Sequence, residues 1–453
     1  PVFHPAELWK ETGRWSEIGD EMGRFKDRNK RDMVMGMTHE EVVTSLVRSE
    51  IRSYRQLPKL IYQIQTKWRD DPRPRAGLIR VREFTMKDSY SLDSDWEGLD
   101  KQYRAHYQAY YNIFNKCDLS CVAVKSDVGM MGGPMAHEFM YLTPVGEDTL
   151  LICDSCGYSA NRQVAQFKKP VPDSEILSNI EKVSTPGTKN IESLAKYLNI
   201  PRSKTAKAVF MMASLTGGAE KDQLVLAMVR GDMEVNETKL VNIIGAKELR
   251  PATDEEIRAS GAVPGYASPI GLKNILVVVD DLIPLTPNMV TGANQEDYHL
   301  WNVNFKRDFD AAKIADITAA QDGDTCIRCS ASLKSVRGVE LGNIFKLGTR
   351  YSEPMNARFL DKDGQKKPVI MGSYGIGSGR LLSCIAEGHY DEKGLMWPIN
   401  VAPFHVHLVV ISGSDKNTDV ENTAENIYND LNTAGVEVLY DDRSETPGVK
   451  FND

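Results

Sequence analysis

The N-terminal part of the chain passes from a helical pattern of apolar residues to two strand-like patterns. A predicted helix begins after Thr38, which stands at the expected position of a capping side chain. Its apolar face would comprise Val42, Val43, Leu46, Val47 and Ile51. Polar and apolar residues then alternate from Leu60 to Gln65, and a second strand-like run extends from Leu78 to Met86. A loop rich in Pro, Arg and Gly separates these two runs, so the pattern predicts a long β-hairpin.

The rest of the chain mixes predicted helices and strands, which places it in the α/β fold class. Helices are predicted at 99–114, 191–198, 381–387 and 420–431. Strands are predicted at 208–212, 224–229, 275–279, 406–411 and 436–440. Residues 168–185 are rich in Lys, Pro, Asp and Ser, which is typical of a linker, and residues 186–318 have the pattern of a self-contained α/β unit.

Composition excludes several classes of protein. The 453 residues, 41% of them hydrophobic, exclude a disordered chain, and no run reaches the roughly 18–20 apolar residues of a membrane-spanning helix. The 55 Lys and Arg against 63 Asp and Glu give a net charge of −8. A globally basic protein is therefore excluded, whereas a local basic groove is not. Seven cysteines are too few for a disulfide scaffold and predict a reducing, cytoplasmic location.

Four of the cysteines form two pairs with the spacing of metal-binding turns. Cys153 and Cys156 make one pair, and Cys326 and Cys329 make the other. Two such pairs complete a tetrahedral site for a structural Zn²⁺, although the intervening 169 residues exceed the roughly 15–20 of an ordinary zinc ribbon. A domain inserted in the ribbon would explain the gap. The alternatives are redox-active dithiols and a chance spacing.

Arginines are concentrated on the predicted hairpin, and a glycine-rich run comes much later. From Arg52 to Lys87 there are ten Lys and Arg against three Asp and Glu, and guanidinium groups suit phosphates and carboxylates. The alternative is a solvated basic face. The run from Gly372 to Arg380 precedes a predicted helix, and glycines there would let the backbone approach an anion. It matches neither a Walker A loop nor a dinucleotide-binding fingerprint.

Together these segments resemble the class II aminoacyl-tRNA synthetases, in particular bacterial-type prolyl-tRNA synthetases. The segment from Trp68 to Phe84 resembles the second class II motif, and Gly375 to Arg380 resembles the third. Gly36 to Glu41 is similar to the loop that holds the amino acid, and Ala136 to Phe139 to a segment that lines the proline pocket. Pro1 is similar to the proline that ends the first motif. One departure is Asp71, where the family usually has Glu.

The resemblance implies that proline and ATP form prolyl-adenylate, and that the prolyl group then passes to tRNA(Pro). It implies Mg²⁺ with the ATP, a homodimer for the full-length protein and no membrane association. The catalytic residues implied are Arg69, which would bridge the proline carboxylate and the α-phosphate, with Arg80 and Arg380 on the other phosphates. Asp71 and Phe84 would contact the adenine side of ATP. The residues implied for proline are Thr38 and Glu40 at its ammonium, His137 beside its ring and Ser373 at the pocket floor.

The α/β unit resembles the editing insertion that hydrolyses Ala-tRNA(Pro). A pocket for proline cannot exclude the smaller alanine, because missing methylenes are worth only about 1–3 kcal/mol of discrimination. The editing residues implied are Thr185, Lys207, Asp280 and His299, with Asp281 nearly as good a candidate as Asp280. Lys207 would hold the terminal phosphate or sugar of the tRNA, and His299 the aminoacyl group or a water molecule.

The predicted architecture is an α+β catalytic domain with an antiparallel sheet of class II type, carrying an α/β insertion. The boundaries expected are 1–167 with 336–396 for the discontinuous catalytic domain, 150–160 with 322–335 for the zinc-ribbon roots, 170–320 for the editing domain, and 397–453 for an incomplete α/β anticodon-binding domain. We expect a piece of a longer protein, because the chain begins at Pro1 without Met and stops just after a turn-like Thr446–Gly448. Alternatives are a threonyl enzyme, a non-catalytic synthetase-like RNA-binding protein and a stand-alone deacylase, which would need no ATP motifs.

Overall fold

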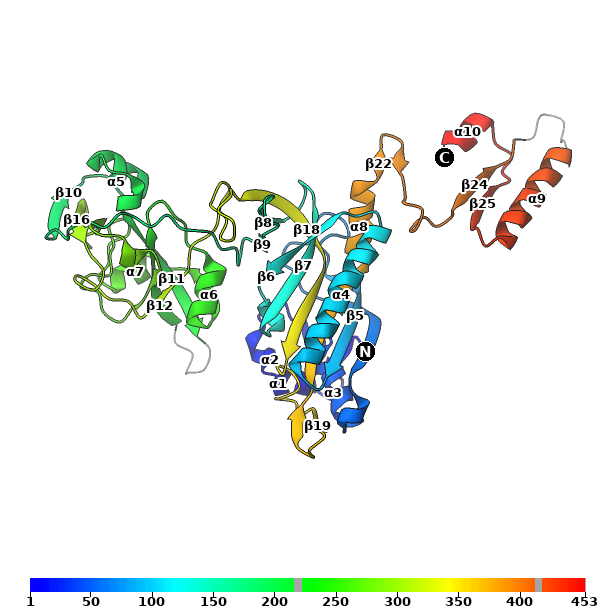
Figure 1. Ribbon diagram of the computed structural model, residues 1–453, viewed down its shortest axis with the longest axis horizontal. Helices are drawn as coiled ribbons and strands as arrows, with labels where there is room; N and C mark the ends of the chain where they lie inside the picture. The colour runs from blue at the N-terminus through cyan, green and yellow to red at the C-terminus, as the bar shows by residue number, and fades with distance from the viewer. Residues whose placement is uncertain (216–221, 412–417, 453) are drawn as a thin grey trace.

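The chain folds into three bodies in the computed structural model, which describes residues 1–215, 222–411 and 418–452 (Figure 1). A central body lies between an inserted body, drawn green, and a C-terminal body, drawn orange to red. The mixed α/β class is therefore confirmed, and each predicted helix and strand overlaps an observed element. No helix in the described ranges combines the length and the apolar character needed to cross a bilayer.

An eight-stranded sheet forms the centre of the central body. All its pairings are antiparallel except the short contact of β6 with β9. In spatial order its strands are β4 (Lys59–Trp68), β5 (Glu83–Asp93), β21 (Ile370–Gly377), β18 (Lys334–Gly348), β7 (Met135–Leu142), β6 (Cys121–Ser126), β9 (Ser159–Asn161) and β8 (Asp148–Ile152). The sheet thus joins two stretches of chain that the inserted body separates.

Helices cover the sheet by burying apolar side chains on both of its faces. On one face α4 (Trp96–Lys116) and α8 (Ser378–Gly388) pack around a cluster that includes Tyr110, Phe139 and Tyr374. On the other face α3 (Glu40–Glu50) contributes Val43 and Val47, as its apolar spacing predicts. Burial of such side chains is worth about 1.5–3 kcal/mol each, which is what holds the helices on the sheet.

Two local expectations were wrong. Thr38 does not cap α3, because the capping position is His39, whose side chain makes no capping bond. The second hairpin strand begins at Glu83 rather than Leu78, although the hairpin itself is present with Trp68 opposite Glu83. Residues 69–82 form a loop closed by an inner bridge between Arg75 and Arg80. Ala76 and Gly77 turn the loop with φ of +55° and +57°, so Leu78 lies in a turn instead of a strand.

The smaller elements of the central body surround this sheet. They are β1 (Phe3–Pro5), β2 (Arg24–Lys26), β3 (Asp32–Met35), β19 (Arg358–Leu360), β20 (Lys366–Pro368), β22 (Tyr390–Asp391), β23 (Gly394–Leu395), α1 (Ala6–Glu11) and α2 (Arg14–Glu17), with 3-10 turns at Tyr54–Gln56 and Gly129–Met131. β3 pairs with β1 and β2, and α1 packs on this small sheet through the buried Trp9.

The inserted body contains a five-stranded mixed sheet and a smaller three-stranded one. The larger has the order β13 (Ala246–Pro251), β11 (Ala206–Leu215), β12 (Asp222–Arg230), β14 (Leu276–Asp280), β17 (Lys313–Ala315). The smaller has the order β10 (Glu181–Ser184), β16 (Tyr298–Val303), β15 (Met289–Gly292). The helices are α5 (Ile191–Leu198), α6 (Glu237–Ile244) and α7 (Asp254–Ala259), with 3-10 turns at Arg202–Lys204 and Ile283–Leu285.

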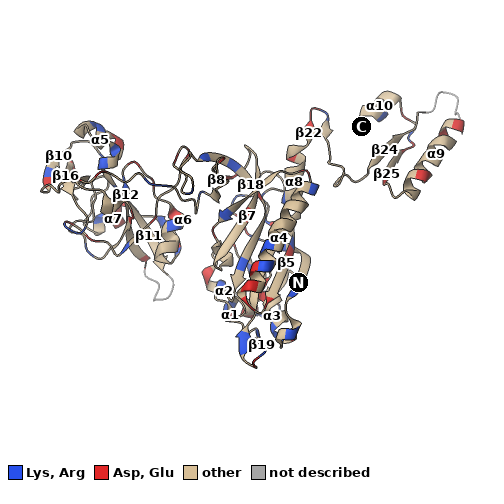
Figure 2. Ribbon diagram, viewed as in Figure 1, with Lys and Arg blue, Asp and Glu red and all other residues tan. Residues whose placement is uncertain are grey.

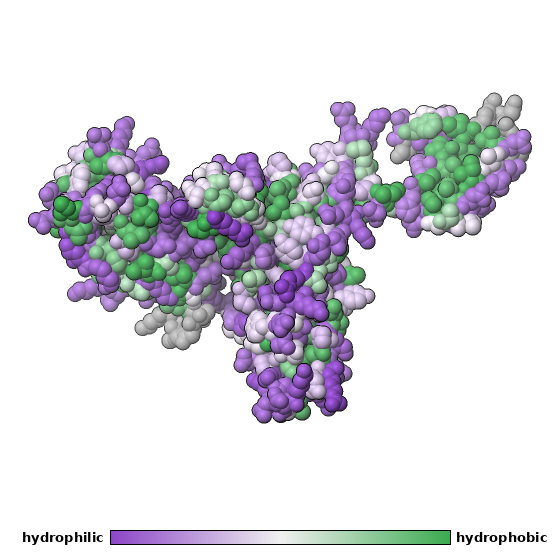
Figure 3. Space-filling model, viewed as in Figure 1, coloured by the Kyte–Doolittle hydropathy of each residue, from purple (hydrophilic) through white to green (hydrophobic). Residues whose placement is uncertain are grey.

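The C-terminal body is a two-stranded parallel sheet with two helices. Its elements are β24 (Val406–Val409), β25 (Val438–Asp441), α9 (Thr418–Thr433) and α10 (Pro447–Asn452). Apolar side chains are conspicuous on the surface of this body (Figure 3), among them Ile427, Leu439 and Phe451.

Lys169 lies where the chain first passes from the central body to the inserted body, and it binds this segment to the five-stranded inserted sheet. Its ammonium lies 2.6 Å from Asp280, 2.6 Å from Asp281 and 2.8 Å from Asp316. The Asp280 side chain is wholly buried at the end of β14, and its other contacts are the backbone amides of Leu282 and Ile317. Lys169 therefore supplies the charge that balances a buried carboxylate.

We predict that Lys169→Met weakens the inserted sheet, because it leaves Asp280 buried without its cation. Loss of one partner of a buried pair costs about 3 kcal/mol, so amide exchange in β14 and β17 should become about a hundredfold faster by hydrogen-exchange mass spectrometry. Asp281→Asn is the matched control, since that side chain is 51% exposed and should have little effect. Equal exchange rates in Lys169→Met and the parent protein would contradict this role.

Candidate active site

A cavity of about 540 Å³ lies beside the loop end of the β4–β5 hairpin. Segments from distant parts of the chain meet there, and they bring together eight residues singled out from the sequence. These are Thr38, Glu40, Arg69, Asp71, Arg80, Phe84, Ser373 and Arg380. The antiparallel order β4-β5-β21-β18 explains the meeting, because it places the end of β21 next to the hairpin.

Arg69 lines this cavity, and its side chain has no hydrogen-bond acceptor among the described residues. It follows β4 directly, and its guanidinium lies 5.2 Å from the centre of the Phe84 ring. Its Nε is buried without a hydrogen-bond partner, and no ion pair to it is found among the described residues. Burial lowers the pKa of Arg69. Its donors are therefore available to an anion that enters the cavity.

Arg80 and Arg380 already have carboxylate partners. Arg80 donates to Asp71 at 2.8 Å and to Glu147 at 2.9 Å, and these bonds raise the pKa of Arg80. Arg380 donates to Glu340 at 2.9 Å and to the carbonyl of Ile79 at 2.9 Å. The hairpin is therefore not a bare basic face, and charges of both signs are interspersed over all three bodies (Figure 2).

Glu40 offers an unused acceptor to the same cavity. Its Oε1 accepts a hydrogen bond from Ser373 Oγ at 2.8 Å, whereas its Oε2 is buried and has no partner in the ranges that the structure describes. A buried carboxylate oxygen without a donor is costly unless a ligand supplies one. Glu40 and Arg69 thus give the cavity one open acceptor and one open donor group.

His39, between Thr38 and the start of α3 at Glu40, is bonded to β4, the strand that Arg69 follows. Lys67 Nζ lies 2.8 Å from His39 Nδ1, and an ammonium only donates, so Nδ1 accepts and Nε2 donates to the Pro1 carbonyl at 2.8 Å. Burial and the Lys67 charge lower the pKa of His39 to about 3, so the imidazole is neutral. Lys67, which also pairs with the buried Asp88, was not singled out from the sequence.

His137 does not line the cavity, contrary to its predicted place beside the proline ring. Its Nδ1 lies 2.7 Å from the Tyr103 hydroxyl on α4, on the opposite face of the sheet. Because side chains alternate along β7, the neighbouring Glu138 lines the cavity instead. Burial and the charge of Glu340 raise the pKa of Glu138, and the same two causes raise the pKa of Asp148.

A second cavity, of about 420 Å³, lies in the inserted body and includes two of the predicted editing residues. Lys207 and His299 line it, and Thr185 Oγ1 lies 2.6 Å from His299 Nδ1. Burial lowers the pKa of His299 to about 4. Lys207 stands near the start of β11 and pairs with Glu234.

Asp280 and Asp281 are not among the residues that line this second cavity, contrary to expectation for Asp280. Both carboxylates bind Lys169 instead. Asp280, at the end of β14, points toward Lys169 and accepts a hydrogen bond from the Ile317 amide at 3.2 Å.

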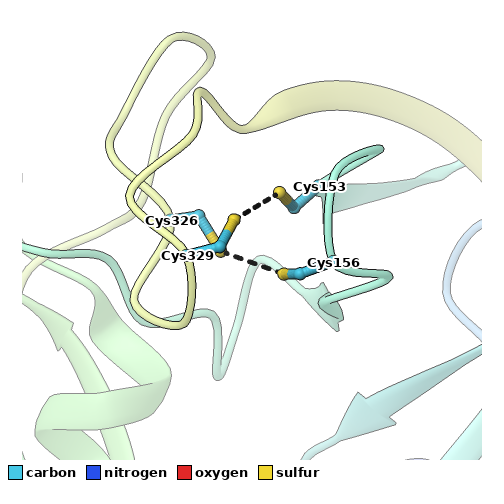
Figure 4. A group of neighbouring side chains, drawn as sticks. All are labelled: Cys153, Cys156, Cys326 and Cys329. Atoms are coloured by element: carbon cyan, nitrogen blue, oxygen red, sulfur yellow. Dashed lines mark hydrogen bonds between the residues drawn. The ribbon is translucent and has the colours of Figure 1, made fainter.

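The four paired cysteines converge at the point where the chain leaves and re-enters the central body (Figure 4). All four sulfurs lie within 4.8 Å of one another, with Cys153 3.4 Å from Cys329 and Cys156 3.7 Å from Cys326. All are free thiols. Sulfurs bound to one tetrahedral Zn²⁺ are separated by roughly 3.8 Å, so the donor set fits that ion.

The two cysteine turns have the same backbone geometry. The amide of Gly157 donates to the Cys153 carbonyl at 2.9 Å, and the amide of Ser330 donates to the Cys326 carbonyl at 3.1 Å. Gly157 and Ser330 both have positive φ, of +69° and +63°. Immediately beside the cluster, the Lys168 amide donates to the Thr325 carbonyl at 2.8 Å, so the outgoing and returning chains are paired there.

Comparisons with known proteins agree with this arrangement. The sequence model of the tRNA synthetase class II core domain (G, H, P, S and T) matches residues 24–389, and that of the anticodon binding domain matches residues 407–453. Proline--tRNA ligase from Salinispora tropica is 57% identical over 458 residues, with 100% of this chain and 76% of that protein covered. The enzyme of the same name from Dehalococcoides mccartyi is 47% identical, with 100% and 78% covered.

A solved structure resembles the fold at much lower identity. Prolyl-tRNA synthetase from Cryptosporidium parvum, crystallised with L-proline and AMP, has a TM-score of 0.51 and 14% identity, with 100% of this chain and 54% of that chain covered. The chain spans about three quarters of the curated relatives' length and about half of this solved chain. Its sequence identity and its matches to both domain models show that the chain belongs to the class II tRNA synthetases, within the bacterial-type proline--tRNA ligases.

Proposed function

We propose that this protein uses ATP to ligate L-proline to tRNA(Pro) through prolyl-adenylate. The observation that carries the proposal is the pairing of an open acceptor, Glu40 Oε2, with an open donor group, Arg69, in one cavity. A zwitterionic amino acid has the complementary charges. The name and high identity of the curated relatives support proline over threonine, and the presence of all three motif arginines supports catalysis over RNA binding alone.

The first reaction joins two anions, so it requires positioning and charge stabilisation rather than a covalent nucleophile. Thr38 and Glu40 would accept from the secondary ammonium of proline, while Ser373 holds Glu40 in place. Arg69 would donate to both the proline carboxylate and the α-phosphate as the carboxylate oxygen attacks phosphorus and pyrophosphate leaves. Arg80 and Arg380 would hold the outer phosphates, with Phe84 and Asp71 on the adenine side.

Mg²⁺ would be held by the acidic group of Glu138, Asp148 and Glu340, which line the cavity next to Arg380. Carboxylate oxygens are its preferred protein ligands, and the raised pKa values of Glu138 and Asp148 reflect the burial of like charges that a cation would relieve. When bound with ATP, Mg²⁺ neutralises phosphate charge. The Arg380 bond to Glu340 keeps this carboxylate and the predicted phosphate-binding cation side by side.

We expect Arg69→Ala to lower proline-dependent ATP–pyrophosphate exchange by at least about 100-fold, the usual cost of removing a preorganised donor from a developing charge. The thermal unfolding midpoint should change little, because Arg69 makes no ion pair among the described residues. Arg82→Ala is the control, since Arg82 pairs with the exposed Asp70 outside the cavity lining. Near-normal exchange in Arg69→Ala would refute its role, and exchange with threonine instead of proline would refute the substrate.

We also propose that the second cavity hydrolyses Ala-tRNA(Pro). Lys207 would bind the phosphate or sugar of the tRNA terminus, and the neutral His299, oriented by Thr185, would hold the aminoacyl group or a water molecule. Support comes from the shared cavity of Lys207 and His299 and from the Thr185–His299 contact. Asp280 has no part in this proposal because it is bound to Lys169.

Lys207→Ala should slow deacylation of Ala-tRNA(Pro) by about 10- to 100-fold, the worth of a charge-assisted hydrogen bond, and should leave charging with proline unchanged. The control is Lys204→Ala, three residues earlier, whose side chain pairs with Glu175 outside the cavity lining. Deacylation at the parent rate in Lys207→Ala would contradict the assignment.

We propose that Cys153, Cys156, Cys326 and Cys329 hold a structural Zn²⁺. The four sulfurs have tetrahedral spacing, and the matching turns present them from both chain crossings. A reducing cytoplasmic location accompanies this proposal, because the thiolates must stay reduced to bind metal. Redox-active dithiols are the remaining alternative.

Native mass spectrometry should find one Zn²⁺ per chain, and none after Cys326→Ser with Cys329→Ser, because two ligands do not retain the ion. Cys121→Ser, which changes a half-buried thiol outside the cluster, should keep the metal. A metal-free parent protein that forms disulfides within the cluster would favour the redox alternative.

A homodimer is part of the proposal, and β4 supplies a surface for it. This strand is at the edge of the eight-stranded sheet, and its Leu60, Tyr62 and Ile64 side chains are 52%, 75% and 66% exposed. Alternate residues point to the same face of a strand, so these three form one apolar stripe. Exposed apolar edge strands commonly pair with another chain.

A further inference from the structure

Arg14 lies behind the amino-acid end of the first cavity and is wholly buried. Its Nη1 donates to Glu41 Oε1 at 2.9 Å, to Glu41 Oε2 at 3.0 Å and to Thr38 Oγ1 at 3.0 Å. Glu41 is also wholly buried and accepts a further bond from Thr12 at 3.1 Å. Burial raises the pKa of Glu41, against the opposing charge of Arg14. The arginine of this buried ion pair thus donates a hydrogen bond to the hydroxyl of Thr38, which lines the cavity.

The hydrogen bonds of Arg14 determine how the Thr38 hydroxyl can be used. A guanidinium has no acceptor, so Thr38 Oγ1 must accept from Nη1. The hydroxyl proton and the second lone pair then remain for a ligand. Thr38 and Glu40 line the cavity, whereas Arg14 does not, so Arg14 can reach a substrate only through Thr38.

Only one of the three guanidinium nitrogens of Arg14, Nη1, makes hydrogen bonds to the described residues. Its Nε and Nη2 are buried and have no hydrogen-bond partner among residues 1–215, 222–411 and 418–452. The guanidinium lies over the rings of Trp9 and Tyr351, at 4.7 and 5.6 Å from their centres. A buried charge pair often contributes no more stability than apolar side chains of the same volume. The burial of this pair is therefore not by itself evidence of a stabilising role.

We propose that Arg14 is a positioning residue that, anchored by Glu41, orients the Thr38 hydroxyl toward the amino group of the substrate. Arg14 comes from α2 and Glu41 from α3, so the pair fixes the hydroxyl relative to two helices at once. The inference rests on the proposed proline-binding role of Thr38 and deepens it. It concerns the KM for proline and leaves the phosphate-binding groups untouched.

A double-mutant cycle tests the inference by ATP–pyrophosphate exchange on the full chain. The variants are Arg14→Met with Glu41→Leu, Thr38→Val, and the three changes combined. Replacing the pair should raise the KM for proline by about tenfold, and so should Thr38→Val, the usual worth of one hydrogen bond to a charged group. In the Thr38→Val background, replacing the pair should add less than about twofold, because the hydroxyl it orients is absent.

Two controls separate positioning from folding. The KM for ATP should stay at the parent value in all variants, and Thr38→Ser, which keeps the hydroxyl, should restore a KM for proline near that of the parent. If the pair replacement does not fold, Arg14→Lys takes its place, since it keeps a cation opposite Glu41 but loses the rigid guanidinium that holds Nη1 between Glu41 and Thr38.

The outcomes distinguish this inference from the proposed function. A tenfold rise that persists in the Thr38→Val background, or an unchanged KM after pair replacement, would overturn the role of Arg14 and leave Thr38 as a proline ligand. An unchanged KM in Thr38→Val would overturn the assignment of Thr38 and, with it, the role of Arg14.

Discussion

The antiparallel pairing of β18 with its neighbours is the interaction on which the rest of the structure depends. β18 pairs with β7 and β8 on one side and with β21 on the other, and so joins residues 135–152 to residues 334–377 across the inserted body. Ser373 and Arg380 reach Glu40 and Arg69 because β21, which pairs with β18 on one side, pairs on its other side with β5 of the hairpin. It also requires the inserted chain to leave and return at nearly the same point, which is where the four cysteines gather.

The electrostatics of the first cavity are set by which charges remain open. Arg80 donates hydrogen bonds to Asp71 and Glu147, and Arg380 donates to Glu340. These bonds hold both arginines in place before a ligand binds. Within the described part of the chain, Arg69 Nε and Glu40 Oε2 have no hydrogen-bond partner. Preorganised charges in a site sheltered from water interact more strongly with a ligand than the same charges in bulk solvent. The paired arginines, Arg80 and Arg380, therefore fix the geometry of the cavity, whereas Arg69 and Glu40 contribute most to the affinity for a ligand.

Residues whose chemistry is local could be predicted from the sequence, whereas residues placed by strand parity or by distant contacts could not. The four cysteines were predicted together, because few side chain sets suit a tetrahedral metal and their turns are short. His137 was chosen where its neighbour Glu138 lines the cavity, since a one-residue shift along β7 reverses the face. Arg14 and Glu41 lie 27 residues apart in two different helices, and no sequence pattern links these helices, so their contact could not be predicted. Asp280 was misplaced for the same reason, because Lys169 lies 111 residues away.

The inserted body is attached to the first cavity by more than its two chain crossings. Asn242 on α6 donates to Asp127 at 2.7 Å, and Thr238 on the same helix lines the cavity together with residues 127–131. Asn236, at the start of α6, donates to the carbonyls of Arg162 and Gln163 in the outgoing chain. α6 is therefore fixed at two places, through Asn236 at its start and through Asn242 in its last turn. A rotation of the inserted body about the cysteine cluster would have to break these bonds. The bonds therefore keep Thr238 of α6 in the wall of the first cavity.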